Sequence, residues 1–400
     1  MNTTATSTAT TSGTVTAVVH TTHADAAAAG RELGQAIREK FADEQPDAVI
    51  LFASSRYDYG QILSGLQDAC HPRALVGCSS AGEFTDHSQA EGSACAFAIR
   101  APEMRFHATI GRGLRQDRSA AARQLVDGLS GLGVSPYQHR TALVLADALA
   151  GHTDDFVQEL TRYTAGTYRF AGGGAGDDAQ FRTTHVFFGT EAITDAAVAL
   201  EILSNKPIGI GVRHGWQPAS DPMRVTEATG SNLVSLNAIP TTEVFQEHAT
   251  ATGQRFDPAE PLPFFLQNVV GIEAPDGYKL RVPLGASEDG AVTFASDVPL
   301  GATARIMETS AKSAADAAAS ATEDAVRQLG THKPAAALFF DCVATRLRTG
   351  TEFGTELEAV RLALGDAQYA GCNTYGQIAR SDGQFSGFHN CTAVVCVLPE

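Results

Sequence analysis

Three polar side chains stand at the ends of short apolar segments that have the composition of buried strands. They are Ser54, Asp147 and Asp341, in the segments AVILFAS, TALVLAD and AALFFDC. In open α/β sheets ligands bind beyond the carboxyl ends of the strands, so these side chains are candidates for a ligand site. An aspartate in such a place binds an ammonium group or caps the next helix. Two aspartates can also act as general acid and base.

A glycine turn follows each of these strands after one helix. The turn residues that we assign to the ligand site are Gly77, Cys78, Ser79, Gly173, Gly371, Cys372 and Asn373. Backbone N–H groups in glycine turns can converge on a carboxylate or phosphate. The alternative is that each glycine only permits a positive φ before a hairpin, and the repetition favours this structural explanation. The run around Gly173 lacks the lysine of a P-loop and the GxGxxG spacing, so we exclude a nucleotide site.

Cys78 and Cys372 are the candidate nucleophiles, because each follows a glycine of these turns. A reactive thiolate needs a pKa that is lowered by a cation or a helix N-terminus, and no histidine adjoins either cysteine. Ser79 and Ser80 do not fit a GxSxG motif, since Ala81 falls at the second glycine. We therefore expect that the protein is not an enzyme. The alternative is a hydrolase or transferase that uses a cysteine or a strand-end aspartate.

Two histidines have distinctive neighbours. His214 lies between Arg213 and Trp216, the only tryptophan, and His389 lies in the segment GFHNCT. One neutral imidazole is sufficient to hold a haem iron, and an arginine can pair with a haem propionate. His214, with Arg213 and Trp216, is thus our candidate haem site, and His389 joins the ligand-binding candidates. No pair of histidines has a spacing such as HExxH, so we predict no protein-bound metal.

These residues belong to an arrangement of elements that occurs three times. Each copy has an opening strand, an alanine-rich helix, an apolar strand, a second helix, a glycine turn and a hairpin. The opening strands are predicted in TVTAVVHT, MRFHATIG and AVTFASDV, and Gly77, Gly173 and Gly371 are taken as equivalent. We predict an α/β fold whose mixed sheets are built from three related β-α-β-α-β-hairpin units, arranged in two lobes.

The predicted units divide the chain into two domains behind a short tail. Residues 1–14 are rich in threonine, serine and alanine and lack the features of a secretory signal, so we predict a disordered tail. Residues 15–235 hold two units and residues 236–400 hold the third. The boundary is expected between residues 230 and 238.

Composition excludes several classes of partner. The net charge of −16 disfavours nucleic acid, and no apolar stretch is long enough to insert into a membrane. The seven cysteines include no CxxC pair, which favours reduced thiols and a cytoplasmic protein.

Three segments resemble the FIST family. GCSSAGEF at 77–84 is similar to a motif of FIST N-terminal domains, and PIGIGVRHGWQP at 207–218 to a strand and turn of the same family. AGCNTYGQIARSDGQFSGFHNCT at 370–392 is similar to the end of FIST C-terminal domains. Gln377 departs from the family, which usually has glutamate there. If that carboxylate contacts a cationic ligand, this chain binds a less basic one or binds it differently.

The resemblance implies a sensory protein that binds a small, amino-acid-like ligand. Some members bind haem and respond to nitric oxide, which implies the alternative of a haem-binding nitric-oxide sensor. Relatives act with a histidine kinase, a cyclic-diguanylate enzyme or a chemoreceptor. Since the 400 residues contain no such output region, we expect the signal to pass to a separate partner protein. Closure of two lobes around the ligand, or a change at an interface, is the expected means.

Overall fold

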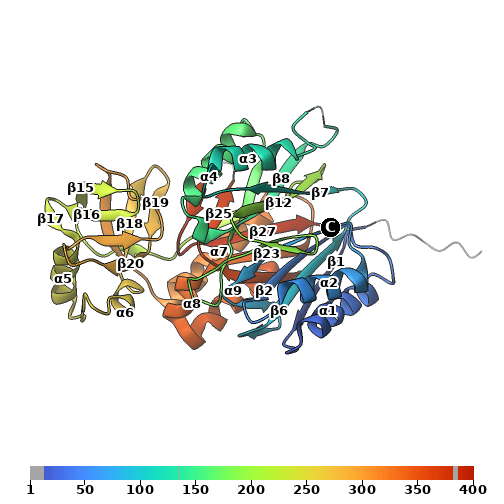
Figure 1. Ribbon diagram of the computed structural model, residues 1–400, viewed down its shortest axis with the longest axis horizontal. Coiled ribbons are helices and arrows are strands. Elements are labelled where there is room, and N and C mark those ends of the chain that lie inside the picture. The colour runs from blue at the N-terminus through green and yellow to red at the C-terminus, as the bar shows by residue number, and fades with distance from the viewer. Residues whose placement is uncertain (1–12, 134, 382–385) are drawn as a thin grey trace, which may run out of the picture.

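The computed structural model describes residues 13–133, 135–381 and 386–400, so most of the predicted tail lies outside the described residues. In this part of the chain the strands form three six-stranded mixed sheets and one nine-stranded sheet. The predicted α/β class is confirmed. The three mixed sheets form one body, and the nine-stranded sheet lies beside it with α5 and α6 (Figure 1).

The first sheet is built mainly by the N-terminal unit. Its strands, in spatial order, are β1 (Val15–Thr21), β6 (Ala94–Arg100), β2 (Ala48–Ser54), β3 (Ala74–Ser80), β10 (Val186–Phe188) and β11 (Glu191–Ile193). The helices α1 (Ala26–Lys40) and α2 (Tyr59–Cys70) pack on one face through residues such as Leu33 and Ile62. The strand β2 is apolar up to its last residue, Ser54, because both of its faces are buried.

The second and third sheets repeat this design. The second contains β26 (Gly387–His389), β25 (Gln377–Arg380), β9 (Arg169–Gly174), β8 (His139–Ala146), β12 (Ala196–Ser204) and β7 (Arg105–Arg112), with helices α3 (Arg118–Asp127) and α4 (Thr153–Tyr163). The third contains β13 (Gly209–Arg213), β27 (Ala393–Pro399), β23 (Pro334–Cys342), β24 (Gln368–Thr374), β4 (Glu83–Thr85) and β5 (Gln89–Ala90), with helices α7 (Ala311–Gln328), α8 (Val343–Thr349) and α9 (Phe353–Leu364). Short 3₁₀ turns η1 (Ala148–Ala150) and η2 (Gly350–Glu352) precede α4 and α9.

Each unit gives its hairpin to the sheet of another unit. The hairpin β4–β5 pairs with β24, β10–β11 pairs with β3, and β25–β26 pairs with β9. The inner faces of the three sheets meet in one apolar core, where the rings of Phe52 and Phe340 lie edge to face at 5.8 Å. The hairpin exchange therefore joins three units into a single body.

A separate domain is inserted between β13 and α7. It comprises residues 217–308, which we call the inserted domain. Its elements are β14 (Gln217–Pro218), β15 (Met223–Thr229), β16 (Asn232–Leu236), β17 (Ile239–Pro240), α5 (Thr241–Thr252), α6 (Leu262–Phe265), β18 (Val269–Ala274), β19 (Gly277–Arg281), β20 (Pro283–Ala286), β21 (Val292–Phe294) and β22 (Thr303–Glu308). Four phenylalanines, Phe245, Phe256, Phe264 and Phe265, are part of its own core.

The opening strand of the third unit was wrongly placed by the sequence analysis. The segment AVTFASDV contains β21, which pairs with β16 and β20 in the inserted domain. The corresponding place is held by β13, which is antiparallel to β27 as β1 is to β6. The insertion moves β13 far from α7 along the chain, and an apolar pattern does not say which sheet a strand joins.

The glycine equivalence also needs a correction by one residue. The parallel strand pairs set the register of the units, with facing residues Leu51–Gly77, Val144–Gly172 and Phe339–Gly371. Gly172 is therefore the equivalent of the two outer glycines, and Gly173 is not. A Cβ atom at Gly172 would lie 1.9 Å from the carbonyl oxygen of Val144, so this contact requires glycine. Three consecutive glycines hide the register in the sequence.

The expected boundary region 230–238 contains β16 and the turn that joins it to β15, within the inserted domain. The boundary region therefore does not separate the second unit from the third, because all three units lie together in the body. Among the described residues, no helix has the length and apolarity of a membrane span.

Candidate functional site

A small polar cavity lies in the third unit beside the inserted domain. It is lined by Arg213, His214, Gly215, Trp216, Ala314, Ala317, Asp341, Thr345, Arg348, Glu356, Cys391 and Ala393. These residues come from the link after β13, from β23, from helices α7, α8 and α9, and from the start of β27. The cavity thus brings together four residues singled out from the sequence: Arg213, His214, Trp216 and Asp341.

Two buried carboxyl groups face this cavity. Asp341 is 1% exposed and Glu356 is 3% exposed. The Oδ2 atom of Asp341 and the Oε2 atom of Glu356 have no hydrogen-bond partner among the described residues. Burial raises the pKa of Glu356 to about 8, and burial together with the nearby Glu356 raises the pKa of Asp341 well above its ordinary value. Since an unpaired buried polar group is costly, the pair favours an occupant that donates hydrogen bonds or is positively charged.

A guanidinium group completes the charged lining. Arg348 lies with its Cζ atom 5.6 Å from the centre of the Trp216 ring. Burial lowers the pKa of Arg348, whereas Cys391, Glu356 and Asp341 oppose this shift. The cavity therefore presents two acids, the guanidinium of Arg348 and one indole wall within a small space, beside Arg213, which is paired with Asp324.

The other two units have apolar side chains where the third has these acids. By the strand register, Asp341 corresponds to Ala53 and Ala146, which pack under the helices of their own sheets. The buried positions of the second helices follow one pattern, which places Glu356 at the position of Ile62 and Phe156. The third unit thus has two carboxyl groups in what is apolar core elsewhere.

His214 is fully engaged within the protein. Its Nδ1 atom accepts a hydrogen bond from the backbone N–H of Trp216 at 3.3 Å, so its Nε2–H donates to the carbonyl oxygen of Tyr278 at 3.0 Å. Burial lowers the pKa of His214, which keeps the ring neutral. Arg213 forms an ion pair with Asp324.

These contacts do not suit haem. Both ring nitrogens of His214 are occupied, and the guanidinium expected to meet a propionate is already paired. Only about 10 Å³ of the cavity admits the centre of a water molecule, which is room for about one water. As placed here, Arg213, His214 and Trp216 do not fit the macrocycle.

The strand-end residues of the first two units are satisfied by the protein itself. The Ser54 hydroxyl donates to Asp178 at 2.8 Å. Asp147 accepts hydrogen bonds from the Thr184 hydroxyl and from the backbone N–H groups of Leu149 and Asp195. Neither residue lines the cavity.

The glycine turns bond to one another. The backbone N–H of Ala81 donates to Asn373, that of Gly174 to Gly376, and that of Gly176 to Ser79, all within 2.9 Å. These amides are therefore not free to bind a carboxylate. Of the predicted turn residues, Gly77, Cys78, Ser79, Gly173, Gly371, Cys372 and Asn373 all lie outside the cavity lining.

Three residues of the third unit that the sequence singled out, Gln377, His389 and Asn373, do not line the cavity. Gln377, the departure from the family, donates to the Thr374 hydroxyl and accepts from the backbone N–H of Thr392. His389 pairs with Gln377 across β25 and β26. Asn373 is 1% exposed and stands opposite Asp341 on the neighbouring strand, and its side-chain amide has no partner among the described residues.

Sequence reasoning missed Glu356, Arg348 and Cys391. One signal was present for Glu356: it falls in phase with Leu357, Val360 and Leu364 on the buried face of α9, where a charged residue is out of place. Arg348 lies in α8, a segment between the strand and α9 of the third unit, and had no signal of its own.

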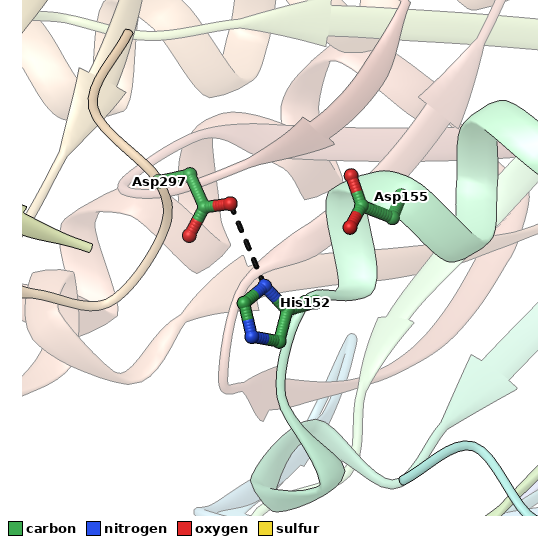
Figure 2. A group of neighbouring side chains, drawn as sticks. All are labelled: His152, Asp155 and Asp297. Atoms are coloured by element: carbon green, nitrogen blue, oxygen red, sulfur yellow. Dashed lines mark ion pairs between the residues drawn. The ribbon is translucent and has the colours of Figure 1, made fainter. Parts of the chain in front are cut away.

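A second polar cluster joins the second unit to the inserted domain. His152, Asp155 and Asp297 point toward one another, and one ligand atom of each lies within 4.8 Å of the others (Figure 2). His152 Nδ1 lies 3.5 Å from Asp297 Oδ2. His152 and Asp155 are exposed, and the buried Arg281 pairs with Asp154 nearby at 3.1 Å. We interpret the cluster as a polar contact between the two parts of the molecule.

Comparison with known proteins identifies the family. The model of the FIST N domain matches residues 47–239 and that of the FIST C domain matches residues 241–380. No curated protein matches the chain.

Among solved structures, the chain is similar to PurLQS from Thermotoga maritima, with 12% identity over 97% of this chain and 74% of that one and a TM-score of 0.23. It is also similar to T. maritima PurL complexed with FGAR, with 11% identity over 97% and 73% of the two chains and a TM-score of 0.25. Likeness at this level carries no argument about fold or function. The two domain matches together cover most of the sequence, and the chain belongs to the FIST family, whose domains are associated with sensory signal transduction.

Proposed function

We propose that this chain is a sensory protein that binds a small, amino-acid-like ligand in the cavity of the third unit and signals to a separate partner. The observation that carries the proposal is the pair of unpartnered buried carboxyl oxygens of Asp341 and Glu356. They lie beside Arg348 in a cavity where the other two units have a packed apolar core.

The lining is complementary to a zwitterion. An ammonium group would donate hydrogen bonds to Asp341 and Glu356 and would return both carboxyl groups to the ionised state. The guanidinium of Arg348 would bind the ligand carboxylate, because its planar donors match a carboxylate in two places. The ring of Trp216 supplies an apolar wall for the rest of the ligand.

Ligand entry requires movement, since the cavity holds only about one water. The inserted domain contacts the third unit through a small apolar cluster that includes Val269, Met307 and Ala344. We propose that the inserted domain moves relative to the body when ligand binds, and that this change at an interface is read by the partner. A histidine kinase, a cyclic-diguanylate enzyme or a chemoreceptor is the proposed class of partner.

Binding without catalysis is our proposal for the same site. The backbone N–H groups of Ala81, Gly174 and Gly176 already donate to carbonyl oxygens of neighbouring turns, so these three groups are not available to a developing oxyanion. Burial also raises the pKa of the predicted nucleophile Cys372 well above its ordinary value.

The test is a thermal-shift screen of the purified chain against zwitterionic amino acids, primary amines and carboxylates. We expect a zwitterion to raise the Tm, and we expect Asp341→Asn and Glu356→Gln to abolish the shift. Glu358→Gln is the matched control, because Glu358 lies on the same helix in an exposed pair with Arg361. The proposal is wrong if no zwitterion stabilises the chain, or if both cavity variants bind as the control does.

A further inference from the structure

Two cysteines that are distant in the sequence meet at the edge of the cavity. Cys342 ends β23, and Cys391 lies just before β27, the antiparallel neighbour of β23. The two thiols lie close enough to influence each other's acidity, and each residue is 4% exposed. Both belong to the apolar contact between the third unit and the inserted domain, and Cys391 also lines the cavity.

The fold places Cys342 where another unit holds an anion. The strand register makes Cys342 equivalent to Ser54 and Asp147. Each of these residues comes three positions after the residue that faces the equivalent glycine on the neighbouring strand. In the second unit the carboxylate of Asp147 accepts from the backbone N–H of Leu149 at 3.1 Å and of Asp195 at 2.6 Å. The equivalent amides in the third unit, of Ala344 and Cys391, act on the Cys342 sulfur. The position is thus built to stabilise negative charge.

This setting is reflected in the acidity of Cys342. The Cys391 thiol, and then the backbone amides of Cys391 and Ala344, lower the pKa of Cys342 to about 6 against the effect of burial. A thiol with such a pKa is a thiolate at neutral pH, which is the reactive form.

Cys391 occupies a special backbone position. Its φ is 49°, in the left-handed region, and the equivalent residues are Gly92 with φ 63° and Asp195 with φ 53°. The fold therefore imposes this conformation in every unit, whichever side chain is present. In the third unit the side chain is a thiol directed at the anion-stabilising position.

A second thiol pair in the chain provides an internal contrast. Cys78 and Cys372 also lie close to each other, but both are fully buried in the central apolar core and neither lines the cavity. Burial raises the pKa of Cys372 well above its ordinary value. Cys372 therefore stays protonated, which makes it unreactive.

We propose that Cys342 and Cys391 form a redox-active dithiol that a peroxide converts to a disulfide at the edge of the ligand cavity. The Cys342 thiolate attacks one peroxide oxygen, an S–O bond forms, the O–O bond breaks and hydroxide leaves. The Cys391 thiol then attacks this sulfenic acid, the S–S bond forms, and the sulfenic oxygen leaves as water with the thiol proton. The hydroxide from the first step takes up a proton from solvent, which replaces the proton that Cys342 released when it ionised. Two electrons pass from the two sulfurs to the peroxide, which becomes two waters.

The experiment titrates the reduced full chain with hydrogen peroxide, blocks free thiols with an alkylating agent and maps the peptides by mass spectrometry. We expect a Cys342–Cys391 disulfide that dithiothreitol reverses, while Cys78 and Cys372 remain reduced at the same dose. The rate of Cys342 alkylation should rise with pH to a plateau above about pH 7, as the lowered pKa requires.

Matched variants separate the chemistry from folding. Cys391→Gly restores the residue of the first unit and its φ, and should leave Cys342 trapped as a sulfenic acid that dimedone labels. Cys78→Ala should leave the Cys342–Cys391 disulfide unchanged. The proposal is overturned if the wild-type chain forms no such disulfide, or if Cys78 and Cys372 oxidise first. These results are independent of ligand binding, so they do not stand or fall with the sensory proposal.

Discussion

The first and third units share one plan and differ in what lies between the second helix and the sheet. In the first unit Ala53 and Ile62 fill this space as part of an apolar core. In the third unit Asp341 and Glu356 take the same two positions and face a cavity that also contains Arg348. The comparison teaches that the polar site of the third unit coincides with two carboxyl groups in a repeated core and with a longer connection before α9.

The strongest test of this comparison places the acid of the third unit in the first. Ile62 lies on the buried face of α2 and is fully buried in the apolar core of the first unit. Ile62→Glu should lower the free energy of unfolding by about 4 kcal/mol or more, because it buries a carboxyl group without a partner and removes apolar packing. Chemical denaturation measures this loss. A loss below about 1 kcal/mol would show that the first unit tolerates the acid as the third does.

The reverse exchange should stabilise the third unit. Asp341→Ala with Glu356→Ile restores the residues of the first unit and removes two buried carboxyl groups that each have one oxygen without a partner among the described residues. We expect the free energy of unfolding at pH 8 to rise by about 2 to 4 kcal/mol, with loss of all ligand-dependent thermal shift. A destabilised double variant would mean that the cavity lining is needed for the fold, contrary to this comparison.

The single change Glu356→Gln tests the comparison through the pH dependence of the free energy of unfolding. The pKa of Glu356 is raised from 4.5 to about 8 by burial, so between these values the folded chain holds a proton that the unfolded chain releases. The free energy of unfolding of the wild type should therefore fall as pH rises through this range, by at most about 1.4 kcal/mol per pH unit. Denaturation at several pH values should show a shallower slope for Glu356→Gln, with Glu358→Gln as the control that keeps the wild-type slope.

The smallest effect on stability is expected at a position where the three units share the same backbone conformation. Cys391→Gly should change the free energy of unfolding by less than about 1 kcal/mol, because φ is positive in the third unit as it is at Gly92. Thermal unfolding of the reduced protein is the measurement. A large loss would show that the Cys391 side chain, rather than the backbone, holds this turn together.

Local structure was well determined by the sequence. The segment AVILFAS was predicted as a buried strand and is β2, and the alanine-rich helix predicted after the first opening strand is α1 (Ala26–Lys40). The three related units and the FIST resemblance could also be predicted from the sequence. The order of apolar strands, helices and glycine turns repeats along the chain, because it follows which residues are buried. Asp341, Arg213, His214 and Trp216 were found as candidates, although their proximity was not.

Only the tertiary structure decided which of these residues form a site. Cys342 rather than Asp341 proved to be the equivalent of Asp147, since loops of different length conceal the strand register. The cavity depends on β13 reaching the third sheet across the inserted domain, and Glu356 meets Asp341 only through the packing of α9 on β23. Sequence pattern records whether a residue is buried, because burial follows the local period of a helix or strand. It does not record which distant residue lies opposite, because that depends on sheet order, on exchanged hairpins and on the path of the chain between them.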